Sequence, residues 1–173
     1  MKRKTIHILA IALLALILIG YACFGKKDAS PAQSFITEFS TVDFYGQAVD
    51  ESIISGKEYT MINFWASFCK PCKKEMPEIQ KIYGELPDNI GIVGVCLDAV
   101  PGRETFDTAK EILEECGVTY TNLTNCPELA QAYDSISDAV PVTVFVNSRG
   151  EQIGDVIIGA DTDAYREVIN SLK

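Results

Sequence analysis

A strand-like apolar run that joins a helix through two closely spaced cysteines is the feature that most constrains this fold. Residues 59–65 (YTMINFW) are rich in β-branched and aromatic residues, as buried strands are. After Cys69 and Cys72, apolar residues recur at helical spacing between Ile79 and Leu86, which indicates a helix with one face on a sheet. The CxxC pair therefore lies where a strand passes into a helix, an arrangement typical of a reversible dithiol.

The position of Cys69 favours its ionised form. The free N–H groups and the positive end of a helix N-terminus stabilise a thiolate, which is the form that attacks disulfides. Lys70, Lys73 and Lys74 add positive charge nearby. We therefore predict that Cys69 is the nucleophile, and that Cys72, one turn further along, is the resolving thiol that closes a disulfide on Cys69.

Two other interpretations of the pair are a zinc site and a structural disulfide. A zinc site needs four ligands, whereas the chain has no second CxxC and only one histidine, His7. A structural disulfide across so short a loop would remove little entropy from the unfolded chain. Pro71 suits the first turn of a helix, since its missing N–H is no loss there. We expect a redox-active dithiol that needs no metal and no cofactor.

The N-terminus has a membrane-targeting pattern, with basic residues 2–4 followed by the uncharged apolar run 6–20. Gly20 and Ala22 satisfy the small-residue rule for signal peptidase, and cleavage there would make Cys23 a candidate lipidation site. The alternatives are an uncleaved anchor, for which the run is short, and a cleaved, released protein. All three place the rest of the chain outside the cytoplasm, and the first two attach it to the membrane.

The chain is accordingly divided into a signal peptide or anchor (1–23), a polar tether (24–33) and a folded domain (34–173). All 24 acidic residues but only 10 of the 15 basic ones follow Lys27, so the exported part carries a net charge of −14. This charge excludes nucleic acid as a plausible partner.

Strands alternate with helices along the folded domain. Residues 35–42 and 47–49 flank a turn and predict a hairpin at the domain edge. The continuous apolar run 90–97 is typical of a parallel strand covered on both faces. The remaining expected elements are a helix at 106–116, a strand at 119–123, a helix at 128–133, a hairpin of 143–147 and 153–158, and a helix at 162–172. The order predicts a three-layer α/β fold.

Four segments are similar to the thioredoxin-like superfamily, and most closely to the membrane-tethered TlpA/ResA-like thiol-disulfide oxidoreductases. They are NFWASFCKPC (63–72), KKEMP (73–77), AVPVTVFVNSRGEQIG (139–154) and a helix-strand insert between Ala99 and Ala139. The resemblance implies a mixed central sheet with helices on both faces, an N-terminal β-hairpin and that insert.

The resemblance also implies roles for individual residues. Val140-Pro141 should be a cis-proline loop that faces the CxxC and presents backbone groups to an incoming polypeptide, the alternative being an ordinary trans proline. Glu75 matches an active-site glutamate that could take the proton of Cys72, the alternative being an exposed glutamate near the helix start. Asn63 replaces the buried aspartate of many thioredoxins, and an amide accepts no proton, so Glu75 is the better candidate.

Residues around the dithiol are expected to contact the substrate protein. Trp65 is predicted to shield the dithiol and to pack against the partner, with a plain core position as the alternative. Lys70, Pro71 and Val140 are the other candidate substrate contacts.

Three further cysteines follow the CxxC. Cys96 and Cys116 lie within apolar patterns and are expected to be buried, inert thiols, while Cys126 begins a predicted helix. A second disulfide among the three is left open, because an exported protein permits one.

The predicted function is an extracytoplasmic thiol-disulfide oxidoreductase that reduces protein disulfides. The resemblance implies oxidised protein thiols as partners, apocytochrome c among them, and a membrane-embedded thiol electron donor. Whether the chain reduces or oxidises its partners depends on its reduction potential. The lysines near Cys69 favour an oxidant because they stabilise the thiolate. The alternatives are a thiol oxidase or peroxidase of the same fold, a copper chaperone, and a non-catalytic binding module.

Overall fold

The computed structural model describes residues 34–36 and 38–173. The predicted anchor, the tether and the candidate lipidation residue Cys23 lie outside the described residues. In chain order the elements are β1 (Ser40–Val42), β2 (Ala48–Asp50), α2 (Ser52–Ser55), β3 (Tyr59–Trp65), α3 (Lys70–Gly84), β4 (Ile90–Cys96), α4 (Glu104–Glu115), β5 (Asn122–Thr124), α5 (Pro127–Asp134), β6 (Val142–Asn147), β7 (Gln152–Ile158) and α6 (Thr162–Ser171). None of the helices in these ranges combines the length and apolarity needed to cross a membrane.

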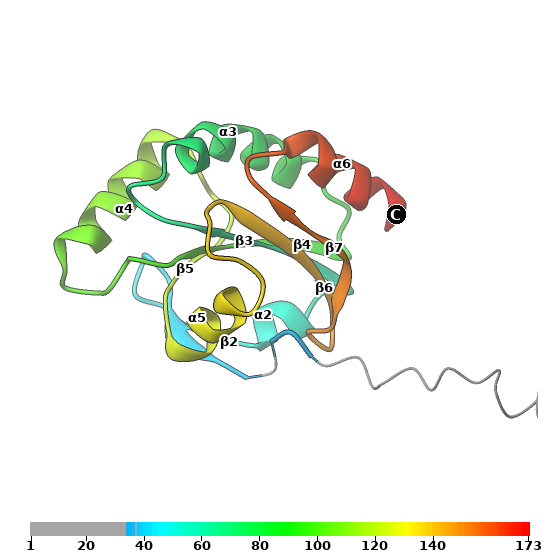
Figure 1. Cartoon of the computed structure of the whole chain (residues 1–173), viewed down its shortest axis with the longest axis horizontal. Coiled ribbons are helices and arrows are strands. Elements are labelled where there is room, and N and C mark those ends of the chain that lie inside the picture. Colours follow the sequence, from blue (N-terminus) through cyan, green and yellow to red (C-terminus); the bar gives the residue numbers. More distant parts are fainter. Residues whose placement is uncertain (1–33, 37) are drawn as a thin grey trace, which may run out of the picture. The chain divides into compact units, whose positions relative to one another are not determined.

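A five-stranded sheet in the order β5-β4-β3-β6-β7 forms the middle layer. β4 runs parallel to both β3 and β5, whereas β6 runs antiparallel to both β3 and β7. Helices α3, α4 and α6 cover one face of the sheet, and α2 and α5 cover the other (Figure 1). The predicted three-layer α/β fold with a mixed sheet is confirmed.

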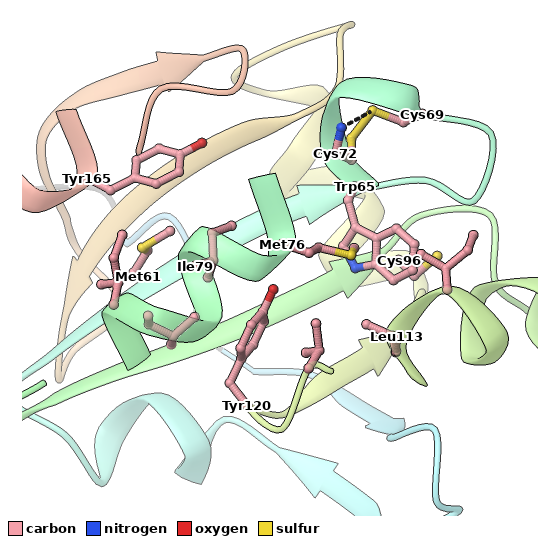
Figure 2. Packing of buried hydrophobic residues seen from close by; sticks show 14 of the residues in the cluster. Met61, Trp65, Cys69, Cys72, Met76, Ile79, Cys96, Leu113, Tyr120 and Tyr165 are labelled. Atoms are coloured by element: carbon pink, nitrogen blue, oxygen red, sulfur yellow. Dashed lines mark hydrogen bonds between the residues drawn. A yellow bond between two sulfur atoms is a disulfide. The ribbon is translucent and has the colours of Figure 1, made fainter. Parts of the chain in front are cut away.

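Side chains of β3 alternate between two hydrophobic cores, because successive residues of a strand point to opposite faces. Met61 and Trp65 pack in the core that includes Ile79 of α3 (Figure 2), and Ile62 and Phe64 pack in the core beneath α5. Asn63 lies between Met61 and Trp65 in this alternation. The central strand therefore presents one amide side chain to the face that α3 covers.

The N-terminal hairpin is present but shorter than predicted. β1 and β2 pair as a separate two-stranded antiparallel sheet. The expectation of a strand from residue 35 is wrong, because the N–H groups of Phe35 and Ile36 donate instead to the carbonyl of Gly150 in the turn between β6 and β7. Gly150 has φ +70°, and a side chain there would overlap with the Ile36 carbonyl, so this turn requires glycine.

The helix-strand insert is confirmed as α4, β5 and α5, although β5 begins at Asn122 rather than at residue 119. The reason is a contact with α3: the N–H of Thr119 donates to the side chain of Gln80 over 2.8 Å, so it is not available to a strand partner. The short helix α2 was not predicted, since four residues carry no helical periodicity.

Candidate active site

Cys69 and Cys72 form a disulfide at the N-terminus of α3, with their Cα atoms 5.3 Å apart. Cys69 is the N-cap residue, and the N–H of Cys72 donates to its sulfur over 3.2 Å, while Pro71 occupies the first turn. Cys69 retains 5% exposure and Cys72 has none. Of the two cysteines, Cys69 is therefore the one with surface that another protein can reach.

The Val140–Pro141 peptide bond is cis, as expected. Val142, the first residue of β6, lies opposite Phe64 near the end of β3. Because β3 and β6 are antiparallel, the start of β6 lies at the same end of the sheet as the residues that follow β3. The cis-proline and the CxxC therefore share one end of the sheet.

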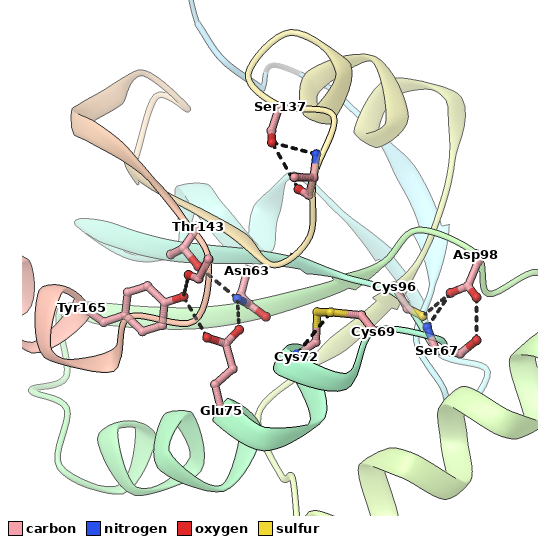
Figure 3. The surroundings of a disulfide bond; sticks show 12 residues. Asn63, Ser67, Cys69, Cys72, Glu75, Cys96, Asp98, Ser137, Thr143 and Tyr165 are labelled. Atoms are coloured by element: carbon pink, nitrogen blue, oxygen red, sulfur yellow. Dashed lines mark hydrogen bonds between the residues drawn. A yellow bond between two sulfur atoms is a disulfide. The ribbon is translucent and has the colours of Figure 1, made fainter.

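The loop between β3 and Cys69 is held by Asp98, which follows the adjacent parallel strand β4. Asp98 accepts hydrogen bonds from the Ser67 N–H over 2.9 Å and from the Ser67 hydroxyl over 2.5 Å (Figure 3). Its carboxylate also accepts from the thiol of Cys96 over 3.3 Å. Asp98 was not predicted from the sequence as a site residue. Its position after a strand that runs parallel to β3 could have indicated that it lies near the CxxC.

Glu75 is buried, with 4% exposure, so the alternative of a solvated glutamate is wrong. One carboxylate oxygen accepts from the Asn63 amide and the other from the Tyr165 hydroxyl, each over 3.0 Å (Figure 3). Burial raises the pKa of Glu75 to about 7, against the smaller lowering effect of these two hydrogen bonds. Glu75 follows Cys72 by three residues on α3, which places both side chains on one helix face.

Two further residues complete the buried cluster around Glu75. Thr143 lies opposite Asn63 in the β3–β6 register, and the Asn63 amide donates to the Thr143 hydroxyl over 3.0 Å. Tyr165 reaches Glu75 from α6, and burial raises the pKa of its phenol. The sequence offered no signal for Tyr165, because its contact with Glu75 joins two distant segments.

Trp65 is a core residue, which corrects the prediction that it packs against a partner. Its side chain has no exposed surface, and its indole N–H donates to the Asn122 side chain over 2.9 Å. It packs in the same cluster as Cys69 and Cys72 (Figure 2). Phe68, which precedes Cys69 and is 75% exposed, was missed as a candidate contact.

An open groove of about 540 Å³ lies beside the CxxC, between the start of α3 and the start of α6. Lys70 and Pro71 are exposed at its edge, and Val140 is half-buried. The groove is lined by Lys70, Pro71, Lys74, Glu75, Glu78, Ala160 and Thr162. It therefore brings two of the predicted contact residues and Glu75 to a common surface, and Val140 is not part of it.

Cys96, Cys116 and Cys126 are free thiols, so the second disulfide that the sequence left open is not formed. Cys96 is buried as expected, whereas Cys116 and Cys126 are partly exposed. Burial raises the pKa of all three thiols, and Asp98 raises that of Cys96 further. Within residues 38–173 we find no three His, Cys, Asp or Glu side chains grouped so that they could hold a metal ion.

Comparison with known proteins identifies the family of the chain. The sequence profile of the AhpC/TSA family matches residues 32–151, a stretch that contains the CxxC, Glu75 and the cis-proline. The chain belongs to the AhpC/TSA family. The thiol-disulfide oxidoreductase ResA of Halalkalibacterium halodurans is 27% identical over 160 residues, which span 87% of this chain and 85% of that protein. ResA of Bacillus subtilis is 26% identical over 178 residues, 99% of this chain and 95% of that protein.

Among solved structures, StoA from Bacillus subtilis superposes on this AhpC/TSA family member with a TM-score of 0.61 at 23% identity. The match covers 79% of this chain and 98% of StoA. The fold is thioredoxin-like, and the resemblance to ResA-type proteins that the sequence indicated is confirmed.

Proposed function

We propose that this chain is a thiol-disulfide oxidoreductase that reduces oxidised protein thiols through Cys69 and Cys72. The observation that carries the proposal is the disulfide at the N-terminus of α3, with Cys69 as the cap residue and the cis-proline at the same sheet end. The relatives named as thiol-disulfide oxidoreductases, aligned over most of both chains, support it.

In the proposed reaction the Cys69 thiolate attacks a disulfide of the partner protein, forms a mixed disulfide and releases one partner sulfur as a thiolate. Cys72 then attacks the Cys69 sulfur, the Cys69–Cys72 bond forms, and the second partner sulfur leaves. Two electrons have passed from the dithiol to the partner. The proton of Cys72 goes to the Glu75 carboxylate, whose pKa of about 7 suits a base at neutral pH.

The partner is proposed to bind at the sheet end that carries Cys69. Exposed Phe68 precedes Cys69, exposed Lys70 and Pro71 follow it, and the last two also line the groove beside α3. The Pro141 carbonyl accepts from the Gly159 N–H over 2.8 Å and is thereby occupied, so backbone pairing with a partner would fall to Val140.

Reduction of insulin by dithiothreitol tests the activity. The full chain is expected to accelerate it, and Cys69→Ser is expected to abolish the acceleration. Absence of catalysis by the wild-type chain would instead favour a non-catalytic binding module. The reduction potential, measured in dithiothreitol or glutathione buffers, tests the direction. A value in the range of strong disulfide oxidants, on the order of −120 mV, would reverse the reductase assignment.

Client proteins can be captured with Cys72→Ser, which leaves the partner attached to Cys69. We extend the proposal to apocytochrome c as a client and to a membrane-embedded thiol protein as electron donor. Both should appear as mixed disulfides of Cys72→Ser and be absent with Cys69→Ser. Capture of other proteins alone would remove the cytochrome from the proposal.

We also propose that residues 1–23 direct the chain to the membrane, residues 24–33 act as a tether, and residues 34–173 work on the extracytoplasmic face. The basic residues and the apolar run at the N-terminus support this arrangement. Protease digestion of intact cells should degrade the domain. Palmitate labelling that is lost in Cys23→Ala would identify a lipoprotein, and an intact N-terminus would identify an uncleaved anchor.

A further inference from the structure

The hydroxyl of Tyr165 lies within hydrogen-bond distance of two acceptors. One is the Glu75 carboxylate at 3.0 Å, and the other is the backbone carbonyl of Gly159 at 3.2 Å. A phenol has a single proton and can donate to only one of them at a time, while its oxygen can also accept. The position of Tyr165 therefore allows two different hydrogen-bond patterns without any movement of the ring.

Asn63, the other partner of Glu75, faces the carboxylate with its amide nitrogen, and its amide oxygen makes no hydrogen bond within the described residues. Its side-chain N–H groups donate to Glu75 and to the Thr143 hydroxyl, each over 3.0 Å. A donor stabilises the carboxylate most, and in a protonated carboxyl group it can pair only with the carbonyl oxygen and not with the new O–H. While the Asn63 amide keeps this orientation, the acceptor for a proton on Glu75 is the Tyr165 oxygen, 3.0 Å from the other carboxylate oxygen.

We propose that Tyr165 is a positioning residue that serves both protonation states of Glu75, an inference that rests on the proposed thiol-disulfide exchange. While Glu75 is ionised, the Tyr165 hydroxyl donates to the carboxylate. Once Glu75 has taken the proton of Cys72, its O–H donates to the Tyr165 oxygen, and the phenol proton turns to the Gly159 carbonyl. Neither state leaves a buried polar atom of this pair unpaired, which removes a large cost from the proton transfer.

The surroundings make Glu75 the buried group that titrates near neutral pH. Its pKa is about 7, whereas burial and the Glu75 charge raise the pKa of both Tyr165 and Tyr120, so these phenols remain neutral there. The groups that face Glu75 are Cys72 on its own helix, Asn63 on β3, Thr143 on β6, Tyr165 on α6 and Tyr120 before β5, with Lys70, Lys74 and Glu78 along the groove.

The direct test is the titration of Glu75 in Tyr165→Phe, which keeps the ring and removes only the hydroxyl. The Glu75 carboxyl is followed by ¹³C NMR in the oxidised, glutamate-labelled chain and assigned by its loss in Glu75→Gln. Both protonation states lose a hydrogen bond in this variant, but the bond to the charged carboxylate is the stronger one, so Glu75 should titrate higher by about half to one pH unit. Tyr45→Phe, which alters a 76% exposed tyrosine, is the matched control and should leave the midpoint unchanged. An unchanged or lowered midpoint in Tyr165→Phe would overturn the proposal.

The reaction itself gives a second readout. A mixed disulfide of Cys69 with 5-thio-2-nitrobenzoate releases its chromophore when Cys72 attacks, and the pH profile of that release should move upward in Tyr165→Phe. In the Glu75→Gln background the same substitution should have no further effect on the profile, and an effect that persists there would contradict the proposed role. If the wild-type chain releases no chromophore, the proposed exchange fails, while the NMR titration still decides the role of Tyr165.

Discussion

The side-chain amide of Asn63 donates to the Glu75 carboxylate over 3.0 Å at a place where both residues are almost fully buried. Asn63 reaches this place because its strand alternates between two cores, and Glu75 because it follows Cys72 by nearly one helical turn. The pair sets a buried proton acceptor beside a dithiol. The stability of the protein should therefore depend on pH in a way that one residue controls.

Glu75→Gln should remove a pH dependence of stability. The folded pKa of about 7 lies above the ordinary value of 4.5, so the folded state binds the proton more tightly than the unfolded state. The contribution of Glu75 to the unfolding free energy should therefore fall as pH rises from about 4.5 to about 7, by about 3 kcal/mol in total. Urea denaturation of the oxidised protein at several pH values measures it.

Plotted against pH, the unfolding free energy of Glu75→Gln should run parallel to that of the wild type above pH 7. The two curves should separate between pH 7 and pH 4.5. Glu114→Gln, on the exposed face of α4, is the control and should follow the wild type throughout. Parallel curves for wild type and Glu75→Gln across the whole range would mean that Glu75 is not the buried titrating group. Glu75→Gln should also slow turnover and alter the pKa of Cys72, and an unchanged thiol titration would count against its role as base.

Asn63→Asp should destabilise the protein most at alkaline pH. The substitution places a second carboxylate beside Glu75 in the core, and two such groups cannot both ionise there. We expect a loss of about 2 kcal/mol or more at pH 8 and a smaller loss at pH 5, measured by urea denaturation. Asn89→Asp is a matched control, because Asn89 donates to Glu58 over 3.1 Å at an exposed site. Equal losses in the two variants would contradict the prediction.

Asp98→Ala should loosen the loop that carries Cys69. Both hydrogen bonds that Ser67 donates to Asp98 would be lost, and the Ser67 N–H would be left without its partner. The expected cost is about 1–3 kcal/mol in the free energy of unfolding, with a changed rate of Cys69 alkylation in the reduced protein. Asp107→Ala, at an exposed site on α4, should change neither quantity. The same Cys69 alkylation rate in Asp98→Ala and Asp107→Ala would mean that the loop does not depend on Asp98.

Gly94→Ala should disturb the packing of Trp65. A methyl group at Gly94 would overlap with the Asn122 amide oxygen, which accepts the hydrogen bond of the Trp65 indole. We expect a cost of about 1–3 kcal/mol and a change in fluorescence, since Trp65 is the single tryptophan of the chain. Gly91→Ala on the same strand meets the flexible side chain of Lys57 at 3.2 Å and the Thr60 hydroxyl at an ordinary contact distance of 3.6 Å, and should be tolerated. Unaltered fluorescence in Gly94→Ala would contradict this account of the contact.

Local patterns predicted much of the fold. The bounds of β3 match the apolar run from which they were predicted, because a strand buried on both faces leaves a continuous signal. The helix after the CxxC was found from its apolar face, and the cis-proline from the resemblance of its segment. These features depend on residues close together in sequence.

The parts of the site that depend on distant residues could not be predicted. Tyr165 meets Glu75 from the last helix and Asp98 meets Ser67 from the next strand, and neither contact has a spacing that a single sequence can reveal. Trp65 was expected to shield the dithiol and to pack against a partner, with a core position as the alternative, and the alternation of β3 turns it into the core. Phe68, outside that alternation, has the exposure that was expected of Trp65.

The central claim is that Cys69 and Cys72 exchange reversibly with a dithiol in solution. It is tested most directly by equilibrating the full chain in buffers of graded dithiothreitol ratio, alkylating it, and locating the labels by mass spectrometry. The account predicts that labels at Cys69 and Cys72 appear together in one two-electron transition, while Cys96, Cys116 and Cys126 remain thiols throughout. A Cys69–Cys72 pair that stays oxidised or stays reduced across the whole range would contradict it.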